Sequence, residues 1–391
     1  MNEAVTDALP QPELPPEHEA VGKHRVREEI GRGGMGRVLR VRDTELKRDV
    51  AMKLLRVDKE QGADPERFVA EARLTGRLDH PNVLPVHELG TSPAGEPFFT
   101  MKLVEGHQSL RDVIEELEAG DPDAHERFSF EQRVQVIQQV CDALHYAHQR
   151  GVIHRDVKPE NVVVGSCGEV YLVDWGVAKQ GNREQVPVKR PPARLSISAE
   201  DFDPRLSESD PHRRVVTQEG ELLGTPAYMA PEQLKGDDAP VGPWTDVYGL
   251  CATLYEFLSL HHYLDGANTT SYLLFLSAVL LHEPTPAEDH REPVQSRVPR
   301  NLSRICQHGL AKEPAERWES VAAMRQALQL WLEGRAPAIC PGTTLQRLLS
   351  RLSRWIDDRP VLAPTVVLTL GALLLASGGL GVALLLRGAL S

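Results

Sequence analysis

The sequence predicts an α+β protein: a small strand-rich part comes first, a larger helical part follows, and a transmembrane helix lies near the C-terminus. Three observations predict this order. Apolar, strand-like runs occupy residues 38–41 and 50–55, and residues 97–106 are typical of a strand followed by a hinge. Apolar residues recur at helical spacing in residues 131–149, and residues 365–386 carry no charge. A chain of 391 residues is too long for one ordinary compact core, so two or three units are expected.

The composition is that of a globular protein, with 41% hydrophobic and 26% charged residues. A net charge of −12 argues against a nucleic-acid partner. The five cysteines are scattered and form no C-x-x-C pair, so neither a metal site nor a disulfide framework is expected, which suits a reducing cytosol. Residues 1–22 are acidic and rich in proline, and are expected to form a disordered tail without a secretory signal.

The glycine-rich segment at residues 29–41 has the pattern G-x-G-x-x-G-x-V between strand-like flanks. Glycines let backbone N–H groups approach phosphate oxygens, but a simple hairpin turn explains the pattern equally well, and a dinucleotide-binding turn is a third reading. A dinucleotide site needs a helix directly after the last glycine, whereas two strand-like runs follow here. Lys53 lies within the second run, and an inward lysine on a buried strand needs an anion. A lysine reaching solvent is the alternative, but the upstream glycines make nucleotide phosphates the better partner.

Residues 152–161 (VIHRDVKPEN) place four charges of both signs directly after an apolar entry. Such charges are costly beside valine and isoleucine unless they are paired or used. An isolated H-R-D tripeptide would be best read as a charged surface turn, but here the full pattern H-R-D-x-K-P-x-N is present. It has the spacing of the protein-kinase catalytic loop, in which an aspartate (here Asp156) orients and deprotonates a hydroxyl. The asparagine five positions later (here Asn161) holds magnesium.

With these ordered motifs, residues 24–333 resemble the bacterial eukaryotic-like serine/threonine protein kinases (Hanks-type protein kinase family). The resemblance implies a two-lobed protein-kinase fold, with a small β-rich N-lobe and a larger helical C-lobe. It also implies transfer of the γ-phosphoryl group of ATP to serine or threonine hydroxyls of protein substrates. The expected boundaries are 1–22 for the tail, 23–334 for the kinase domain (N-lobe 23–104, C-lobe 105–334), 335–364 for a juxtamembrane segment and 365–386 for the transmembrane helix.

The resemblance assigns a role to each motif residue. Asp156 and Lys158 are the expected catalytic residues: the first takes the proton of the acceptor hydroxyl, and the second neutralises the transferred group. The expected contacts of ATP are Ile30, Gly31, Gly33, Gly36, Val38, Ala51, Lys53, Glu71, Met101, Leu103 and Asn161. The expected ligands of Mg²⁺ are Asn161 and Asp174.

Two of these assignments have plain structural alternatives. Glu71 is the helix carboxylate that should pair with Lys53, but the same predicted helix carries other charged residues, so a solvated glutamate fits the sequence equally well. Met101 should gate the adenine pocket, with the backbone of residues 102–104 against the adenine edge. An ordinary core strand accounts for the same apolar residues.

Asp174-Trp175-Gly176 stands where the family has D-F-G. The metal-binding carboxylate is intact, but tryptophan is larger than phenylalanine and carries an N–H that needs a partner when buried. How readily this aromatic swings between packings is therefore open. The departure supports one alternative function, a pseudokinase scaffold that binds nucleotide without transfer. Retention of Lys53, Asp156 and Asn161 argues against it.

The segment between Asp174 and Glu232 is longer than the family leads one to expect. The excess, at about residues 180–219, is rich in proline and serine and is expected to be disordered. An inert surface insertion is the default reading. Regulation by autophosphorylation is the alternative: a phosphate on Thr217, added in trans within a homodimer, would meet the cation of Arg155.

Residues 224–232 (GTPAYMAPE) resemble the substrate-binding loop of the family, and together with Lys158 they indicate serine or threonine acceptors. Two structural roles also follow from the resemblance. Glu232 should pair with Arg317, and Asp246 should begin the buried central helix of the large lobe.

The C-terminal part differs in character. Residues 343–356 form a predicted basic amphipathic helix, suited to an anionic membrane surface or, alternatively, to docking on the kinase. The 22 uncharged residues 365–386 would span about 33 Å as a helix, which matches a hydrocarbon core of about 30 Å. Residues 272–281 are apolar but too short to span, and a core helix is expected there.

Arginines are distributed unequally around the predicted span. Those before it are Arg347, Arg351, Arg354 and Arg359, and Arg387 follows it. The side richer in arginine stays in the cytoplasm, so a single-pass protein of the cell inner membrane with a cytoplasmic kinase domain is expected. A receptor with an outer sensor is not expected, because only residues 387–391 follow the span.

Overall fold

The computed structural model describes residues 20–33, 36–55, 65–176, 178–180, 226–234, 240–291 and 294–335. The chain separates into two units, Met1–Gln326 and Ala327–Ser391. Residues 1–19 of the expected tail, most of the expected insertion, the amphipathic helix and the transmembrane helix lie outside the described residues. The expected boundary of the tail at residue 22 is wrong, because Ala20–Val21 pair with the next strand and Val21 is buried in the apolar core. Within the described ranges, no helix combines the length and the apolar character that a bilayer crossing needs.

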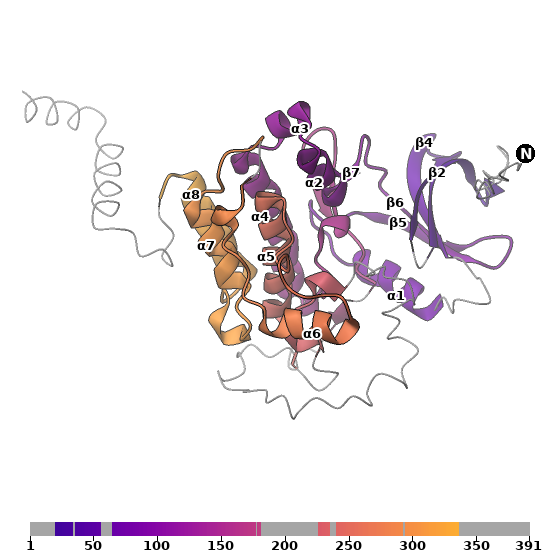
Figure 1. Ribbon diagram of the computed structural model, residues 1–391. Helices are drawn as coiled ribbons and strands as arrows, with labels where there is room; N and C mark the ends of the chain where they lie inside the picture. Colours follow the sequence, from indigo (N-terminus) through magenta and orange to yellow (C-terminus); the bar gives the residue numbers. More distant parts are fainter. Residues whose placement is uncertain are drawn as a thin grey trace, which may run out of the picture. The chain divides into compact units, whose positions relative to one another are not determined.

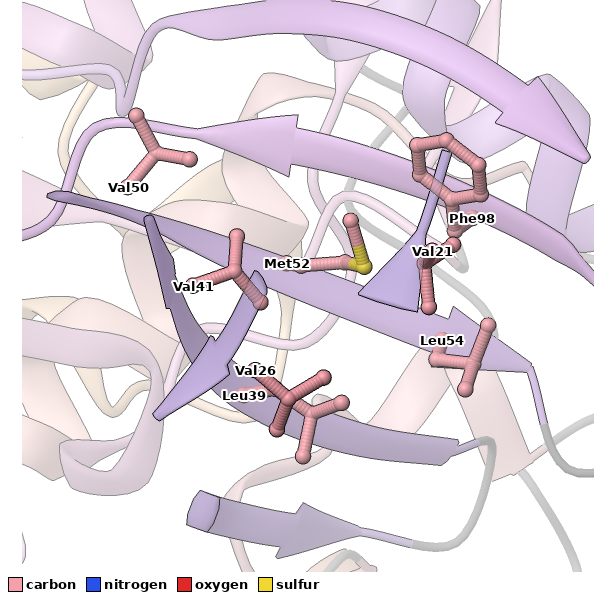
Figure 2. Packing of buried hydrophobic residues seen from close by; sticks show 8 residues of the cluster. All are labelled: Val21, Val26, Leu39, Val41, Val50, Met52, Leu54 and Phe98. Atoms are coloured by element: carbon pink, nitrogen blue, oxygen red, sulfur yellow. The ribbon is translucent and has the colours of Figure 1, made fainter. Parts of the chain in front are cut away.

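A six-stranded antiparallel sheet forms the first part of the fold, with the order β1-β2-β3-β4-β6-β5 (Figure 1). Its strands are β1 (Ala20–Val21), β2 (His24–Gly33), β3 (Gly36–Asp43), β4 (Arg48–Leu55), β5 (Val86–Thr91) and β6 (Pro97–Met101). Strand residues alternate between two faces. One face carries the apolar cluster in Figure 2: Val21, Val26, Leu39, Val41, Val50, Met52, Leu54 and Phe98.

The opposite face of the sheet receives helix α1 (Pro65–Thr75), which packs on β5 and β6. Phe68 and Ala72 of this helix join Leu55 and Phe99 in a second apolar cluster. Glu71 lies on the same buried side of the helix, because residues three and four apart share a face. The helix therefore carries a carboxylate toward the sheet.

The second part of the described chain is mainly helical (Figure 1). Its helices are α2 (Leu110–Glu118), α3 (Pro122–Arg127), α4 (Phe130–His148), α5 (Pro243–Ser259), α6 (Tyr272–Leu281), α7 (Arg300–Gly309) and α8 (Val321–Leu332). Every residue of α5 from Trp244 to Ser259 is buried, and the helix contacts α2, α4 and α7. A helix that is buried all round forms the core, as expected for the segment containing Asp246.

One expected helix and one expected ion pair are confirmed, and a second expected helix needs correction. The helix predicted at 131–149 is α4, and it begins with a capping box formed by Ser129 and Gln132. The pair of Arg317 with Glu232 is present, with two N–O distances of 2.8 Å. The core helix predicted at 272–281 forms as α6, but Leu273 and Leu281 are exposed. An apolar run without periodicity cannot show which of its sides is buried, so the sequence overstated the burial.

A two-stranded and a three-stranded sheet position the loop segments at residues 154–161 and 173–176. Strand β8 (Val152–Ile153) pairs with β11 (Lys179–Gln180). A three-stranded sheet has the order β10-β9-β7, from β10 (Val170–Leu172), β9 (Val162–Val164) and β7 (Gln108–Ser109). The β9–β10 hairpin turns at Gly168, whose φ of 82° favours glycine. As a result, the segments on either side of the hairpin, 154–161 and 173–176, lie next to each other.

Candidate active site

The predicted catalytic loop runs from β8 to β9 and holds Asp156 in a fixed position. Lys158 Nζ lies 2.8 Å from Asp156 Oδ2, and the Nδ2 of Asn161 donates to the same oxygen at 3.0 Å. Asn161 also donates to the backbone oxygen of Asp156 at 2.8 Å. The three polar residues that the motif singled out are thus brought together, with the carboxylate oriented by an ammonium group and an amide.

Hydrogen bonds to Asp246 of α5 anchor the backbone of this loop. Its carboxylate accepts from the N–H of His154 at 2.9 Å and from the N–H of Arg155 at 2.7 Å. It also contacts Nε2 of His148 at 2.6 Å. Arg155 has a φ of 72°, which is uncommon for a residue with a side chain. A buried carboxylate that fixes two successive N–H groups explains how the strained turn before Asp156 persists.

Lys53 of β4 connects the sheet to the other two carboxylates of the site. Its Nζ lies 2.7 Å from Glu71 Oε1 and 3.8 Å from Asp174 Oδ1. Burial opposes the charge on Lys53, but the carboxylates of Asp174 and Glu71 outweigh it and raise the pKa of the ammonium. The expected pair of Lys53 and Glu71 is therefore present, and the reading of Glu71 as a solvated glutamate is wrong.

Asp174 adopts a φ of 61°, and the glycine that follows makes room for two carboxylates. A Cβ on Gly176 would lie 3.1 Å from Glu71 Oε2 and 3.2 Å from Asp174 Oδ1, which is tighter than an ordinary contact. Any side chain here would push the acidic groups apart.

Trp175 is fully buried, with 1% of its surface exposed. Its Nε1 donates to the backbone oxygen of Leu172 at 3.2 Å, and its ring meets that of His154 edge to face at 4.5 Å. The N–H that made the tryptophan questionable thus has a partner. In this arrangement the aromatic ring points into the core, while 43% of the Asp174 side chain is exposed beside Lys53.

The register of the sheet places five of the predicted nucleotide contacts on one face. Gly31 pairs with Val38, Val38 with Lys53, and Ala51 with Met101. Directly paired residues share a face, as do residues two apart. These five residues therefore line the face opposite the cluster of Figure 2, on the same side as the Lys53 ammonium.

The remaining predicted contacts lie at the edges of this face. Ile30 sits at a bulge of β2, Gly33 ends β2, and Leu103 follows β6. Gly36 begins β3, where a Cβ would lie 2.2 Å from the backbone oxygen of Leu54. Only glycine fits there, so the chain turns close against β4.

Asn161 and Asp174 fit the magnesium ion that the motifs imply. Mg²⁺ prefers oxygen ligands, and the Asp174 carboxylate supplies them. Both contacts of Asn161 described above use its amide nitrogen, which leaves its amide oxygen as the atom suited to a cation.

Comparison with known proteins agrees with this geometry. The family model for the protein kinase domain matches residues 24–330, most of the chain. The chain belongs to the protein kinase family. A serine/threonine-protein kinase PknD from Protochlamydia amoebophila is 31% identical over 325 residues, covering 81% of this chain and 30% of the relative. The PknD of Chlamydia trachomatis serovar L2b is 33% identical over 309 residues, covering 78% of this chain and 31% of the relative.

The chain spans less than a third of the length of these curated relatives. Among solved structures, the PknI kinase domain of Mycobacterium tuberculosis superposes with a TM-score of 0.51 at 22% identity. The similarity covers 80% of this chain and 97% of that one, and it shows the protein-kinase fold.

One group of functional interest was missed by the sequence. Arg111 of α2 contacts Glu160 of the catalytic loop, Tyr228 of the predicted substrate-binding loop and Glu256 of α5. Glu160 and Tyr228 lie within two of the motifs but were given no role there, while Arg111 and Glu256 lie in none of them and are distant in sequence. No local signal could have found the cluster.

Proposed function

We propose that the chain is a membrane-anchored serine/threonine protein kinase that acts in signal transduction and transfers the γ-phosphoryl group of ATP to protein hydroxyls. One observation carries the proposal: Lys53 contacts both Glu71 and Asp174, while Asp156 is held by Lys158 and Asn161. The arrangement supports catalysis by positioning and charge stabilisation, which is what phosphoryl transfer needs.

Each residue has a separate task in this proposal. Bound Mg·ATP supplies the phosphoryl group and part of the charge neutralisation. Lys53, kept protonated by its two carboxylate neighbours, holds the inner phosphates. Asp156 aligns the acceptor hydroxyl and accepts its proton. Lys158, beside it at 2.8 Å, offsets the negative charge of the transferred group.

The choice of serine and threonine acceptors is supported by Lys158 in the catalytic loop and by the A-P-E loop at residues 224–232, of which 226–232 are described. The PknD relatives are named serine/threonine kinases. A pseudokinase scaffold is the second candidate, and the tryptophan in the D-W-G segment was its support. The buried, hydrogen-bonded position of Trp175 weakens that candidate, because Asp174 stays next to Lys53.

The full chain, solubilised in detergent, should transfer ³²P from Mg·ATP to a generic basic protein. Acid hydrolysis of the product should release phosphoserine or phosphothreonine and no phosphotyrosine. A complete lack of transfer despite measurable nucleotide binding would favour the scaffold. Labelling that continues when EDTA replaces magnesium would contradict the role of the metal. A matched control is the same preparation with the non-hydrolysable analogue AMP-PNP.

Autophosphorylation of the segment between Asp174 and Glu232 is a further part of the proposal. Nε of Arg155 is buried and has no hydrogen-bond partner among the described residues. A phosphate could supply that partner, since it brings two negative charges and three acceptor oxygens. Thr217 remains the preferred site, although it lies outside the described residues. Phosphopeptide mapping of the labelled chain would show whether it is modified, for example in trans within a homodimer.

Residues 365–386 are proposed as the membrane anchor, on the basis of their length and lack of charge. Leu374→Arg with Leu375→Arg would place two charges in the middle of the span, at about 2.5–3.5 kcal/mol each on insertion scales. This double variant should move from the membrane pellet to the soluble fraction. The control Leu374→Ala with Leu375→Ala should stay in the pellet.

Protease protection of intact spheroplasts tests the orientation of the chain in the membrane. The kinase domain should resist protease added to intact spheroplasts and be digested after lysis. A wild-type chain that is soluble without detergent would overturn the anchor. Digestion in intact spheroplasts would overturn the cytoplasmic placement.

A further inference from the structure

The described residues border an open hollow of about 430 Å³ outside the nucleotide face. It lies where α2, α5, the catalytic loop and the predicted substrate-binding loop meet. Its lining includes six polar or charged residues: Arg111, Glu160, Tyr228, Glu256, His262 and Asp265. The hollow therefore borders two segments that a peptide substrate must pass.

A carboxylate buried at the wall of this hollow is Glu256, of whose side chain 6% is exposed. The guanidinium group of Arg111 binds this carboxylate in a bidentate manner: Nη1 donates to Oε1 at 2.8 Å and Nη2 to Oε2 at 3.3 Å. The hydroxyl group of Tyr228 donates a hydrogen bond to the same carboxylate. A two-pronged contact of this kind is specific for a guanidinium, and a lysine cannot reproduce it.

Arg111 also reaches the catalytic loop, since its Nε donates to Glu160 at 3.2 Å. Glu160 is four residues beyond Asp156 in the chain. A peptide with its acceptor hydroxyl at Asp156 would thus carry a neighbouring side chain past Arg111. The guanidinium stands at the place where that side chain would meet the two glutamates.

The negative charges of this cluster are largely balanced by Arg111, a residue of the chain itself. Burial opposes the charge of Arg111, but hydrogen bonds to Glu256 outweigh it and raise the pKa of the guanidinium. Burial lowers the pKa of His262, so the imidazole at the wall is neutral near pH 7. Asp265 also lines the hollow, so without Arg111 three carboxylates would surround it and the buried Glu256 would lack a cation. An unpaired buried charge is strongly unfavourable.

We propose that Arg111 determines peptide specificity by occupying, from within the chain, a site that would otherwise take an arginine side chain of the substrate. The proposal rests on the kinase activity put forward above. The wild-type enzyme has no need of a basic residue at this position in its substrates, because its own arginine already satisfies Glu160 and Glu256. Removal of Arg111 opens the site, and an arginine from the peptide replaces it.

The test compares wild type with Arg111→Ala on a set of threonine peptides that carry one arginine, scanned through the positions flanking the acceptor. Wild type should show kcat/KM values that vary little along the scan. The variant should gain about thirtyfold or more for arginine at one position, the least effect expected when a buried unpaired charge regains its partner. Arg111→Ala combined with Glu256→Gln should lose the gain, because no buried charge is left.

Two further measurements keep the outcome decisive. Arg111→Lys keeps a charge and is expected to give a smaller gain, so it decides the question if Arg111→Ala does not fold. Methylguanidinium added to Arg111→Ala should raise its melting temperature more than methylammonium does. Arg297→Ala, which removes an exposed arginine paired with Asp289, is the control and should behave as wild type.

Three results would overturn the proposal. One is a wild-type enzyme that already prefers arginine at one position, since the hollow would then take the substrate side chain beside Arg111. The second is a pair of variants, Arg111→Ala and Arg111→Lys, with the wild-type profile. The third is a gain that survives in the Glu256→Gln double variant. A wild-type chain that transfers no phosphate would instead contradict the kinase function itself.

Discussion

Replacement of Asp156 by asparagine is expected to lower phosphoryl transfer by roughly 10² to 10⁴-fold, the range associated with loss of a general base. Asparagine keeps the shape of the side chain and can still accept from Asn161, but it cannot take the proton of the acceptor hydroxyl. The contact with Lys158, 2.8 Å long, also loses its charge pairing. The kcat should fall, and the affinity for Mg·ATP should change little, since no phosphate contact is assigned to this residue.

Lys53→Met is expected to be comparably inactive for a different reason. It removes the cation between Glu71 and Asp174, which lie 2.7 and 3.8 Å from its ammonium. Nucleotide affinity should therefore drop together with kcat. Lys23→Met, which removes a partly exposed lysine paired with Glu88, is the matched control. Steady-state rates, nucleotide titrations and circular dichroism of the full-length variants would separate lost chemistry from lost folding. Transfer near the wild-type rate by Asp156→Asn would contradict its assignment.

The motif residues could be predicted because each pattern is contiguous. Asp156, Lys158 and Asn161 lie within six positions, so backbone continuity alone brings them together. Glu71 is different: it is 18 positions from Lys53, and only the packing of α1 on the sheet decides between an ion pair and a solvated side chain. The sequence accordingly left both readings open. The structure resolves them through the buried face that Glu71 shares with Phe68.

Other features could not be predicted, either because the residues involved are far apart in the sequence or because the sequence carries no signal that distinguishes the alternatives. Arg111 is 145 positions from Glu256 and 117 from Tyr228, and no local pattern links such residues. The consequence of Trp175 depended on whether its N–H would find an acceptor, and the acceptor is a backbone oxygen that carries no sequence signal. For α6, uniform hydrophobicity concealed which side is exposed.

Asp246→Asn is expected to damage both activity and stability, although the residue touches neither nucleotide nor acceptor. Its carboxylate accepts three contacts, from the N–H groups of His154 and Arg155 and from His148. An amide has one oxygen, so at least one buried donor loses its acceptor, at a cost of about 1–3 kcal/mol in the free energy of unfolding. The turn at Arg155 should then relax. Because a misplacement of about 1 Å can cost about 10²-fold in rate, kcat should fall by roughly that factor.

The pH dependence gives an independent check of this anchor. Burial alone would raise the pKa of Asp246, but the hydrogen bond and charge of His148 outweigh it and lower the pKa below its ordinary value. The stability that the carboxylate provides is therefore present above about pH 4, the pKa of an unfolded aspartate, and is lost as the pH falls through the lower folded value. Urea unfolding should show wild type and Asp246→Asn far apart at pH 7, and converging below about pH 4.

A matched control is Asp289→Asn, which removes an exposed carboxylate paired with Arg297 and should change the free energy of unfolding by less than about 0.5 kcal/mol. If Asp246→Asn is destabilised yet keeps its kcat, the carboxylate supports the fold without setting the catalytic turn. If its kcat falls while unfolding at pH 7 is unchanged, the energetic argument is wrong. Both losses together are expected, because one buried carboxylate holds the two N–H groups that immediately precede Asp156.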